Sequence, residues 1–473
     1  MRKWQVKSLT GEWWRLGQSE QKFRGVLELD DQDHGTLTLE GSWNDLSRMP
    51  HPFIGTLHGV ILEESRHSEV TAFDVITSQG PTSSYPQSGS TSHATLFTNT
   101  IVIGSHLESK DDPLIMGAVF ELTGLEHWSA NTGFSQEVER GENDGIAAFT
   151  FRYRGQETAE YSVSPDIKIR FRTGFTSATS HRKATLEEHH TLGVSFGRAA
   201  SINEVQNERY IWQSLLTFAL REPSLCRSIQ LSFESGAPKV EHPGRLIIPG
   251  PKDGSRERSF HFGKSLFNGD KLGARTEEIL VKWRNLHQEI EMAISLMFGV
   301  AHNDETYIHT QLLNYLQAIE ILHRELYKLS RFSQPEDRRA TLTALRDAVP
   351  KHLDPSLRRY IHDQIGFIGS LTLLDRLKDL SRRYPSSVGP LFPLGDEDMV
   401  RLKDVRNFLT HYGDHPHFDR KFLWSREILV LLGKTRHFLE VCILGALGMT
   451  DAEIRSLLDN VEEYVMWKRE PSP

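Results

Sequence analysis

The spacing of apolar residues changes once along the chain, and this change constrains the fold more than any other feature. Up to about residue 200, apolar and polar positions alternate in short segments rich in β-branched and aromatic residues, which is typical of strands. From Thr276 onward, apolar residues recur at helical spacing. We therefore predict an α+β multidomain chain. A β-rich N-terminal sandwich or barrel-like domain would precede an all-α helical bundle.

The predicted strands are separated by Gly, Pro, Ser and Asn. The clearest ones lie in "GTLTLEGSW", "FIGTLHGVILEE", "ATLFTNTIVIGSHL", "GIAAFTFRYRG" and "DIKIRFRTGF". Composition predicts a flexible loop over 78–94, "SQGPTSSYPQSGSTSHA". One helix, over 202–222, interrupts the strands. These segments together predict an antiparallel domain with one embedded helix.

A stretch rich in Gly, Pro and charge, "PGPKDGSRERSFHFGKSLFNGDKLG" (249–273), separates the two patterns. A chain of 473 residues is too long for one ordinary core. We therefore predict two domains, 1–262 and 275–470. In the second domain, amphipathic patterns predict helices over 305–329, 335–348, 369–383, 396–412, 418–447 and 450–466.

The composition is that of a folded globular protein, with 38% hydrophobic and 25% charged residues. A formal net charge of −8 disfavours extensive binding along duplex DNA. The two cysteines, Cys226 and Cys442, are too few for a structural zinc site or a disulfide framework. The start of the chain has no apolar signal region, and the longest apolar runs are far shorter than a membrane span. We expect a cytoplasmic protein without a membrane partner.

Several common catalytic motifs do not occur in the sequence. It contains no phosphate-binding G-x-x-x-x-G-K-[ST], no dinucleotide G-x-G-x-x-G, no H-E-x-x-H and no G-x-S-x-G. "EEHH" (187–190) lies in a strand-like segment, where neighbouring histidines point to opposite faces, so a solvated strand is favoured over a metal site. We expect neither a cofactor nor a metal.

The most informative motif is "RNFLTHYG" (406–413), at the end of the helix predicted over 396–412. Leu402, Val405, Leu409 and Tyr412 share one face at about 100° per residue, with Phe408 at its margin. Asn407 and His411 are four residues apart, so they stack on the opposite, polar side. Arg406 lies at the edge of the apolar stripe, from which its long side chain can reach that side. Gly413 lies where a left-handed residue would end the helix.

These residue types suit cleavage of RNA, because RNA supplies its own nucleophile, the 2′-hydroxyl. An imidazole can move protons near neutral pH, and a guanidinium can stabilise the charge that develops on phosphorus. The spacing by itself is weak evidence, since Arg256 and His261 have the same separation. Spacing alone favours an ordinary charged helix surface.

The context adds a family resemblance. "VRNFLTHYG" resembles the R-[polar]-x3-H motif of the HEPN superfamily, and "LLNYLQAIEILHRE" (312–325) looks like the earlier HEPN helix of the ApeA-like branch. "LTGLEHWSANTGF" (122–134) and "YIWQSLLTFALREP" (210–223) are similar to the domain that precedes HEPN in ApeA anti-phage proteins. The resemblance covers nearly the whole chain.

This resemblance implies an endoribonuclease that acts in abortive infection without a metal. It implies that Arg406 and His411 are the catalytic pair and that Asn407 is the intervening polar residue. It also implies a homodimer or higher homo-oligomer in which two motifs line one cleft. RNA would be the substrate, tRNA being one candidate, and a phage-derived trigger would activate the protein. The N-terminal domain would have a sensing or regulatory role.

A different class of function stays open: a non-catalytic RNA-binding or scaffold protein that uses the bundle for dimerisation. Glu320 and His323 share one face of the predicted helix over 305–329 and could approach the cleft, but an exposed, salt-bridging face is favoured. Two basic pairs could guide RNA or could be solvated helix ends; they are Arg358 with Arg359, and Arg382 with Arg383. His415 and His417 are expected to be loop residues.

Overall fold

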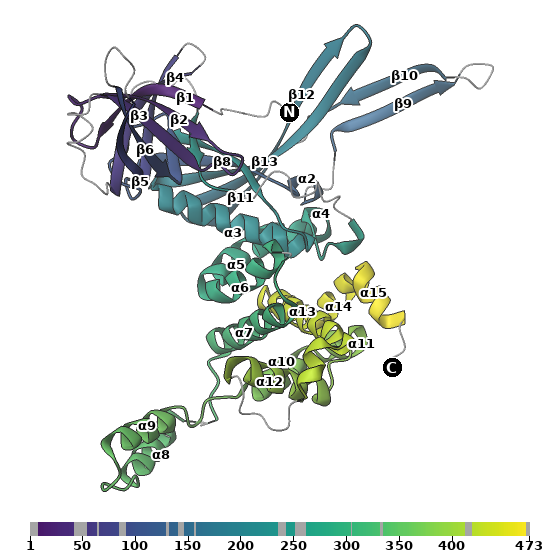
Figure 1. The fold of residues 1–473 in the computed structure, drawn as a ribbon. Coiled ribbons are helices and arrows are strands. Elements are labelled where there is room, and N and C mark those ends of the chain that lie inside the picture. Colours follow the sequence, from purple (N-terminus) through teal and green to yellow (C-terminus); the bar gives the residue numbers. More distant parts are fainter. Residues whose placement is uncertain are drawn as a thin grey trace. The chain divides into compact units, whose positions relative to one another are not determined.

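The structure is a computed structural model. It describes residues 8–41, 54–63, 66–84, 91–128, 132–140, 146–155, 158–234, 243–250, 262–303, 305–331, 334–411 and 419–469. The chain divides into two compact units: Met1–Phe262 with Phe267–Val281, and Gly263–Leu266 with Lys282–Pro473. Strands dominate the first unit and helices the second (Figure 1). The predicted fold class, a β-rich domain followed by an all-α helical domain, is confirmed.

The first unit begins with a closed six-stranded barrel. Its strands are β1 (Ser8–Arg15), β2 (Phe23–Leu29), β3 (Gly35–Gly41), β4 (Ile54–Glu63), β5 (Arg66–Ser84) and β6 (Thr91–Thr98). They follow the order β5-β4-β1-β2-β3-β6, and pairing of β5 with β6 closes the circle. Closure removes the exposed sheet edges that an open sheet of this size would present.

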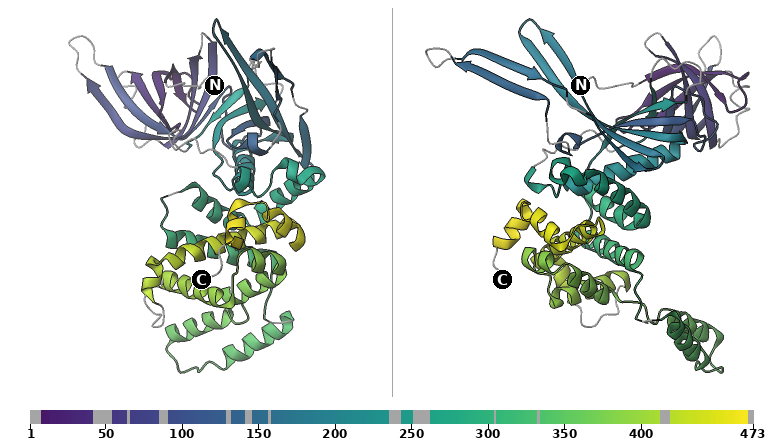
Figure 2. Two further views of the ribbon diagram at one scale, coloured as in Figure 1. Left: turned by 90° about the vertical axis from the view of Figure 1, so that its right-hand side faces the viewer. Right: turned by 180° about the vertical axis from the view of Figure 1, so that it is seen from behind.

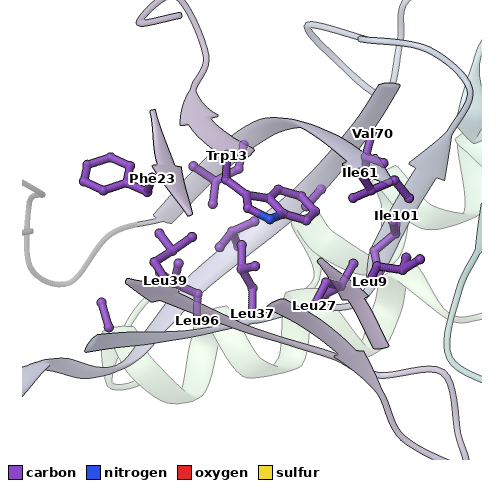
Figure 3. Close-up of a cluster of buried hydrophobic side chains, with 14 of the residues drawn as sticks. Leu9, Trp13, Phe23, Leu27, Leu37, Leu39, Ile61, Val70, Leu96 and Ile101 are labelled. Carbon is purple, nitrogen blue, oxygen red and sulfur yellow. The ribbon is translucent and has the colours of Figure 1, made fainter. Parts of the chain in front are cut away.

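The barrel is filled by side chains that alternate inward along each strand (Figure 3). Trp13 is fully buried and lies among Leu27, Leu37 and Ile61. Trp13 in β1 pairs with Gly59 in β4, where an added Cβ would come within 2.6 Å of the indole ring. Glycine at this position therefore leaves space for the largest side chain of the core.

One edge of the barrel continues into an open sheet, because β5 also pairs with β7 (Thr100–Ile103). The order from there is β7-β15-β14-β8-β13-β12-β11. Bounds of the further strands are β8 Ile115–Leu122, β11 Ala159–Ser164, β12 Ile167–Ser180, β13 Lys183–Ala200, β14 Cys226–Phe233 and β15 Gly244–Ile247. Helix α3 (Ile202–Leu220) contacts β8 and β13 and is buried along most of its length. The predicted helix over 202–222 is thus confirmed.

Two long ribbons extend from this sheet (Figure 2). One is the outer part of β12 and β13, and the other pairs β9 (Phe134–Arg140) with β10 (Ile146–Tyr153). The flexible loop predicted over 78–94 is wrong for much of its length. β5 runs to Ser84 and β6 begins at Thr91, with Thr82 opposite His93. Ser and Thr residues can form a strand when a neighbouring strand supplies the hydrogen-bond partners, and composition does not reveal that neighbour.

The second unit is a helical bundle around α13 (Arg426–Ala446). Its other main helices are α6 Glu291–His302, α7 Ile308–Tyr327, α10 Leu373–Arg383, α11 Pro385–Leu391, α12 Asp396–His411, α14 Asp451–Leu458 and α15 Glu462–Arg469. Helix α7 contacts α6, α10, α12 and α13. Helices α8 (Pro335–Asp347) and α9 (Pro355–Gly366) pack on each other around Leu342, Val349 and Ile365 (Figure 1).

The predicted helices differ from the observed ones in several places, and α11 is one helix that was not predicted. The helix over 418–447 begins only at Arg426, after a 3-10 turn, η3 (Arg420–Trp424). The helix over 450–466 is two helices, α14 and α15. Helix α9 was not predicted either, although Leu357, Ile361 and Ile365 recur in it at helical spacing. No helix in the described ranges is long and apolar enough to cross a membrane.

Helix α5 (Thr276–Glu289) contains the division between the two units, after Val281. Phe267, which lies before the start of α5, is fully buried in the first unit. Its ring centroid lies 6.0 Å from that of Trp128 in α2 (Leu125–Trp128) and 6.0 Å from that of Phe218 in α3. The later part of the stretch 249–273 is therefore anchored on the β-rich unit through Phe267.

His287 in α5 makes the helical unit sensitive to acid. Its side chain is buried, and burial lowers the pKa of the imidazole to about 4. Below pH 6.5 the unfolded chain binds a proton that the folded chain does not, so stability falls as the pH decreases. Between pH 6.5 and 5 the loss is about 2 kcal/mol. We expect urea unfolding, followed by far-UV circular dichroism, to show this loss between pH 7 and 5.

The variant His287→Gln removes the titrating group and is the control for this prediction. Its unfolding free energy should fall less than that of the wild type over the same pH range, with a remaining decrease from His323, whose pKa is also lowered by burial. Carboxyl groups such as Asp379 and Asp451 have a lowered pKa in the folded state. They lose their contribution to the free energy of unfolding only below the pKa of Asp in the unfolded chain, near 3.9. A variant that is as acid-sensitive as the wild type would contradict the assignment to His287.

Candidate active site

Helix α12 carries the motif, and its sequence explains its position in the bundle. Asp396, Glu397 and Asp398 lie in the first turn, where carboxylates favour the positive end of a helix. The residues that face the core are buried and recur at helical spacing; they are Met399, Leu402, Val405 and Phe408. We expected Phe408 at the margin of this face, but it is only 4% exposed, and Leu409 is half-buried instead.

Arg406 and Asn407 lie together at the surface of α12, as the helix spacing predicted. Arg406 Nη1 donates to Asn407 Oδ1 at 3.3 Å, and its Nη2 donates to Glu320 Oε2 at 3.1 Å. The side chains of Arg406 and Glu320 are 29% and 21% exposed, so the ion pair is partly shielded from water. The guanidinium is thus held from two sides, and its buried Nε–H makes no hydrogen bond with the described residues.

His411 is the last residue of α12, one turn after Asn407. Its side chain is not among those described. The same holds for the whole of Tyr412 and of the predicted helix terminator Gly413, as well as for His415, His417 and the second Arg–His spacing, Arg256 and His261. Thr410 Oγ1 donates to the backbone oxygen of Arg406 at 2.6 Å, a bond that a helical threonine commonly makes to the carbonyl four residues earlier.

His323, one turn after Glu320 on α7, is fully buried, so the expected exposed face is wrong for this residue. The other expectation, an approach to the motif, fits Glu320, which the structure brings to Arg406. His323 Nδ1 lies 2.9 Å from Arg376 Nη1, and its Nε2 lies 3.1 Å from Asp379 Oδ2. A guanidinium can only donate, so Nδ1 accepts and Nε2–H donates. This pattern fixes a neutral imidazole in one tautomer.

The pKa shifts around His323 agree with this assignment. Burial lowers the pKa of His323, and the positive charge of Arg376 acts in the same direction, against Asp379. Burial also lowers the pKa of Arg376, which the carboxylate of Glu320 opposes. Burial would raise the pKa of Asp379, but hydrogen bonds from Arg383 and His323 keep it below its ordinary value. Glu320 therefore interacts with both Arg376 and the guanidinium of Arg406.

The network on α10 was missed at the sequence level. Asp379 accepts from Arg383 Nε at 2.8 Å, and the Arg383 guanidinium lies 3.9 Å from the ring centroid of Tyr327 on α7. Arg376, Asp379 and Arg383 are spaced three and four residues apart, so they share one helix face. That spacing in the sequence could have indicated their shared helix face. Arg383 is committed to this network, whereas Arg358, Arg359 and Arg382 are exposed.

"EEHH" lies in β13, as expected, and His190 Nε2 lies 3.6 Å from Glu188 Oε2. Glu188 accepts from the backbone N–H of Gly133 at 3.0 Å, and His189 Nε2 is 2.9 Å from Thr176 Oγ1. Across the described ranges, no group of three or more His, Cys, Asp or Glu side chains is arranged to hold a metal ion.

Comparison with protein families decides the relationship. The model of ApeA N-terminal domain 1 matches residues 8–283, more than half of the chain. The chain belongs to the ApeA family. A second model, Apea-like HEPN, matches residues 313–453, which include α7, α10, α12 and α13. Neither a curated protein nor a solved structure shows a significant match.

The two matched regions follow each other in the order that the sequence motifs suggested. The ApeA N-terminal region covers the barrel, the open sheet and α3, and the HEPN region covers the helices that bring Glu320 to Arg406. The predicted family is therefore confirmed. The second match identifies the helical domain as an HEPN domain.

Proposed function

We propose that this ApeA family protein is an anti-phage endoribonuclease that acts by abortive infection. It cleaves RNA at a dimeric HEPN site without a metal, through Arg406, Asn407 and His411. The observation that supports this most directly is the position of Arg406. Its guanidinium lies at the end of α12 beside Asn407, within the region matched by the HEPN model, with a buried N–H that makes no hydrogen bond with the described residues.

The proposed chemistry needs three groups. His411 takes the proton of the 2′-hydroxyl or protonates the leaving oxygen, as an imidazole can near neutral pH. Arg406 stabilises the charge on the phosphorane, since a guanidinium grips phosphate oxygens with two parallel hydrogen bonds. Asn407 accepts from Arg406 and keeps it near the helix end. No redox group or activated nucleophile of the protein is required.

Glu320 is the proposed positioning residue of this site. It holds Arg406 Nη2 at 3.1 Å and is itself mostly buried. The ion pair fixes the guanidinium and also offsets its charge, so a phosphate must share the guanidinium with Glu320. A second protomer would bring a second motif into the same cleft, which suits a homodimer or higher oligomer. We propose RNA as the substrate, with tRNA as one candidate, in the cytoplasm.

The β-rich unit has a proposed sensing or regulatory role, with a phage-derived component as the trigger. The alternative function is a non-catalytic RNA-binding or scaffold protein that uses the bundle for dimerisation. The Arg406–Glu320 ion pair is the observation that favours it, because a neutralised guanidinium is a weaker phosphate ligand. Purified protein that binds RNA but does not cut it, from resting and from infected cells, would support this alternative.

Sequencing of RNA 5′ and 3′ ends tests the proposal directly. Cells carrying the wild-type protein should accumulate new RNA ends after phage infection, and cells carrying His411→Ala should not. The two proteins should be present at equal levels, as measured by immunoblotting. The positions of the new ends identify the substrate. Equal phage protection by wild type and His411→Ala would sink the proposal.

A further inference from the structure

An aromatic cluster lies at the start of α7 and at η3, within the helical unit. Tyr307 precedes the helix, His309 is in its first turn, and Trp424 ends the 3-10 turn. The rings of Tyr307 and His309 are nearly parallel, 12° apart, with centroids separated by 5.6 Å. The Trp424 ring meets His309 edge-on at 6.2 Å. Three rings from two distant chain segments thus form one surface.

This surface is open to solvent. The side chain of Trp424 is 82% exposed and that of Tyr307 is 74% exposed. A tryptophan is rarely left so exposed, because burying its large apolar ring is strongly favourable. Exposed aromatic groups of this kind mark places where a partner or ligand binds.

The charges around the cluster favour a polyanion over an apolar protein surface. Trp424 lies within "DRKFLWSRE" (419–427), where Arg420, Lys421 and Arg426 are exposed and form no ion pair with any described residue. The two carboxylates of this segment are already used. Asp419 accepts from the backbone N–H of Lys421, and Glu427 pairs with Arg401. Unpaired cations interleaved with exposed aromatic rings are the pattern of single-stranded nucleic acid binding.

The cluster also lies near the candidate active site. The Arg420 guanidinium lies 5.4 Å from the ring centroid of Phe408, so η3 contacts α12 at its core-facing side. Along α7, His309 and Glu320 are eleven residues apart, which corresponds to roughly 16 Å of helix axis. An RNA strand with one phosphate at Arg406 can therefore place an unpaired base, a few nucleotides away, on the aromatic rings.

We infer that Tyr307, His309 and Trp424 form a stacking platform for an unpaired base of a single-stranded RNA, with Arg420, Lys421 and Arg426 binding its phosphates. This inference rests on the proposed function, since it assigns how that substrate is held. The platform favours single-stranded segments and loops, because in a duplex the faces of the bases are already stacked.

Binding measured without cleavage tests the platform. The probe is a fluorescein-labelled single-stranded RNA of mixed sequence, titrated with full-length His411→Ala protein and followed by fluorescence anisotropy. Trp424→Ala should weaken binding by roughly 5- to 100-fold, as expected for the loss of one base–aromatic stack. Trp424→Phe should keep most of the affinity. The same RNA annealed into a duplex should bind with an affinity that Trp424→Ala does not change.

Phe97→Ala is the matched control, since this phenylalanine is 48% exposed on β6 of the first unit, in a strand without Lys or Arg. It should bind RNA as tightly as its parent, whereas Tyr307→Ala should weaken binding and serves as the second variant if Trp424→Ala does not fold. Light scattering of each variant gives its oligomeric state. A Trp424→Ala protein that loses affinity only because it dissociates into smaller species would identify a protein–protein interface and overturn the platform.

Two further outcomes separate this inference from the proposed function. If RNA binding depends on Trp424 but the protein with His411 intact cuts no RNA, the nuclease fails and the platform stands. If RNA is cut with the same kcat/KM and bound with the same affinity by wild type and Trp424→Ala, the platform fails and the nuclease stands. Wild-type protein that does not bind single-stranded RNA at all would also overturn the platform.

Discussion

Arg406→Ala is expected to lower the rate of RNA cleavage by about 10³-fold or more, because one guanidinium on a transferring phosphoryl group typically has an effect of this size. The fold should be retained, since Arg406 is partly exposed and α12 is anchored by Leu402, Val405 and Phe408. The measurement is the initial rate of cleavage of labelled cellular small RNA by protein purified from phage-infected cells. Circular dichroism would confirm that the variant is folded.

Arg401→Ala is the matched control, on the same helix and five residues earlier. Its guanidinium pairs with Glu397 and Glu427, away from Glu320. We expect its cleavage rate to stay within a few-fold of the wild-type rate. Arg406→Lys keeps the charge but loses the two parallel hydrogen bonds, so it should remain strongly impaired. Full activity in Arg406→Ala would exclude Arg406 from the reaction.

His323→Ala is expected to destabilise the helical unit by about 3 kcal/mol. The substitution opens a cavity at a fully buried position and removes the hydrogen-bond partners of Arg376 and Asp379. Both partners are partly buried, so water replaces the imidazole only in part. Urea unfolding at pH 7, followed by far-UV circular dichroism, gives the change in the free energy of unfolding.

His352→Ala is the comparison for this variant, because His352 is exposed between α8 and α9. A surface substitution of this kind should change the free energy of unfolding by less than about 0.5 kcal/mol. His323 is one helical turn from Glu320, so the same loss of packing should also loosen the support of Arg406. If His323→Ala changes the free energy of unfolding as little as His352→Ala does, the hydrogen bonds of His323 contribute little to stability.

Much of the fold was predictable because apolar spacing reports secondary structure locally. Alternation located three strands of the barrel, β3, β4 and β6, and helical spacing located α7, α12 and α13. The predictions failed where a strand or helix is stabilised by contacts with a neighbouring strand or helix. The Ser- and Thr-rich parts of β5 and β6 are strands because they pair with each other, and α9 packs on α8 around Leu342, Val349 and Ile365.

In the candidate site, the sequence predicted a contact within one helix but not the contacts between helices. Arg406 and Asn407 are adjacent on one helix, so their contact followed from helix geometry. The contact between Arg406 and Glu320 joins residues 86 positions apart, and it depends on the packing of α12 against α7. The network of His323 with Arg376 and Asp379 has the same origin. Spacing along α10 indicates a shared face, but it does not indicate what that face meets.

The long strand β5 belongs to two sheets at once, since it closes the barrel with β4 and β6 and also pairs with β7. A shift of β5 by one residue relative to β7 would turn Val70 and Ala72 out of the barrel interior as well. Each sheet therefore fixes the alignment of the other. A ligand that distorts the barrel would displace strands β7 and β15 with it, so this unit is built to respond as a single mechanical element.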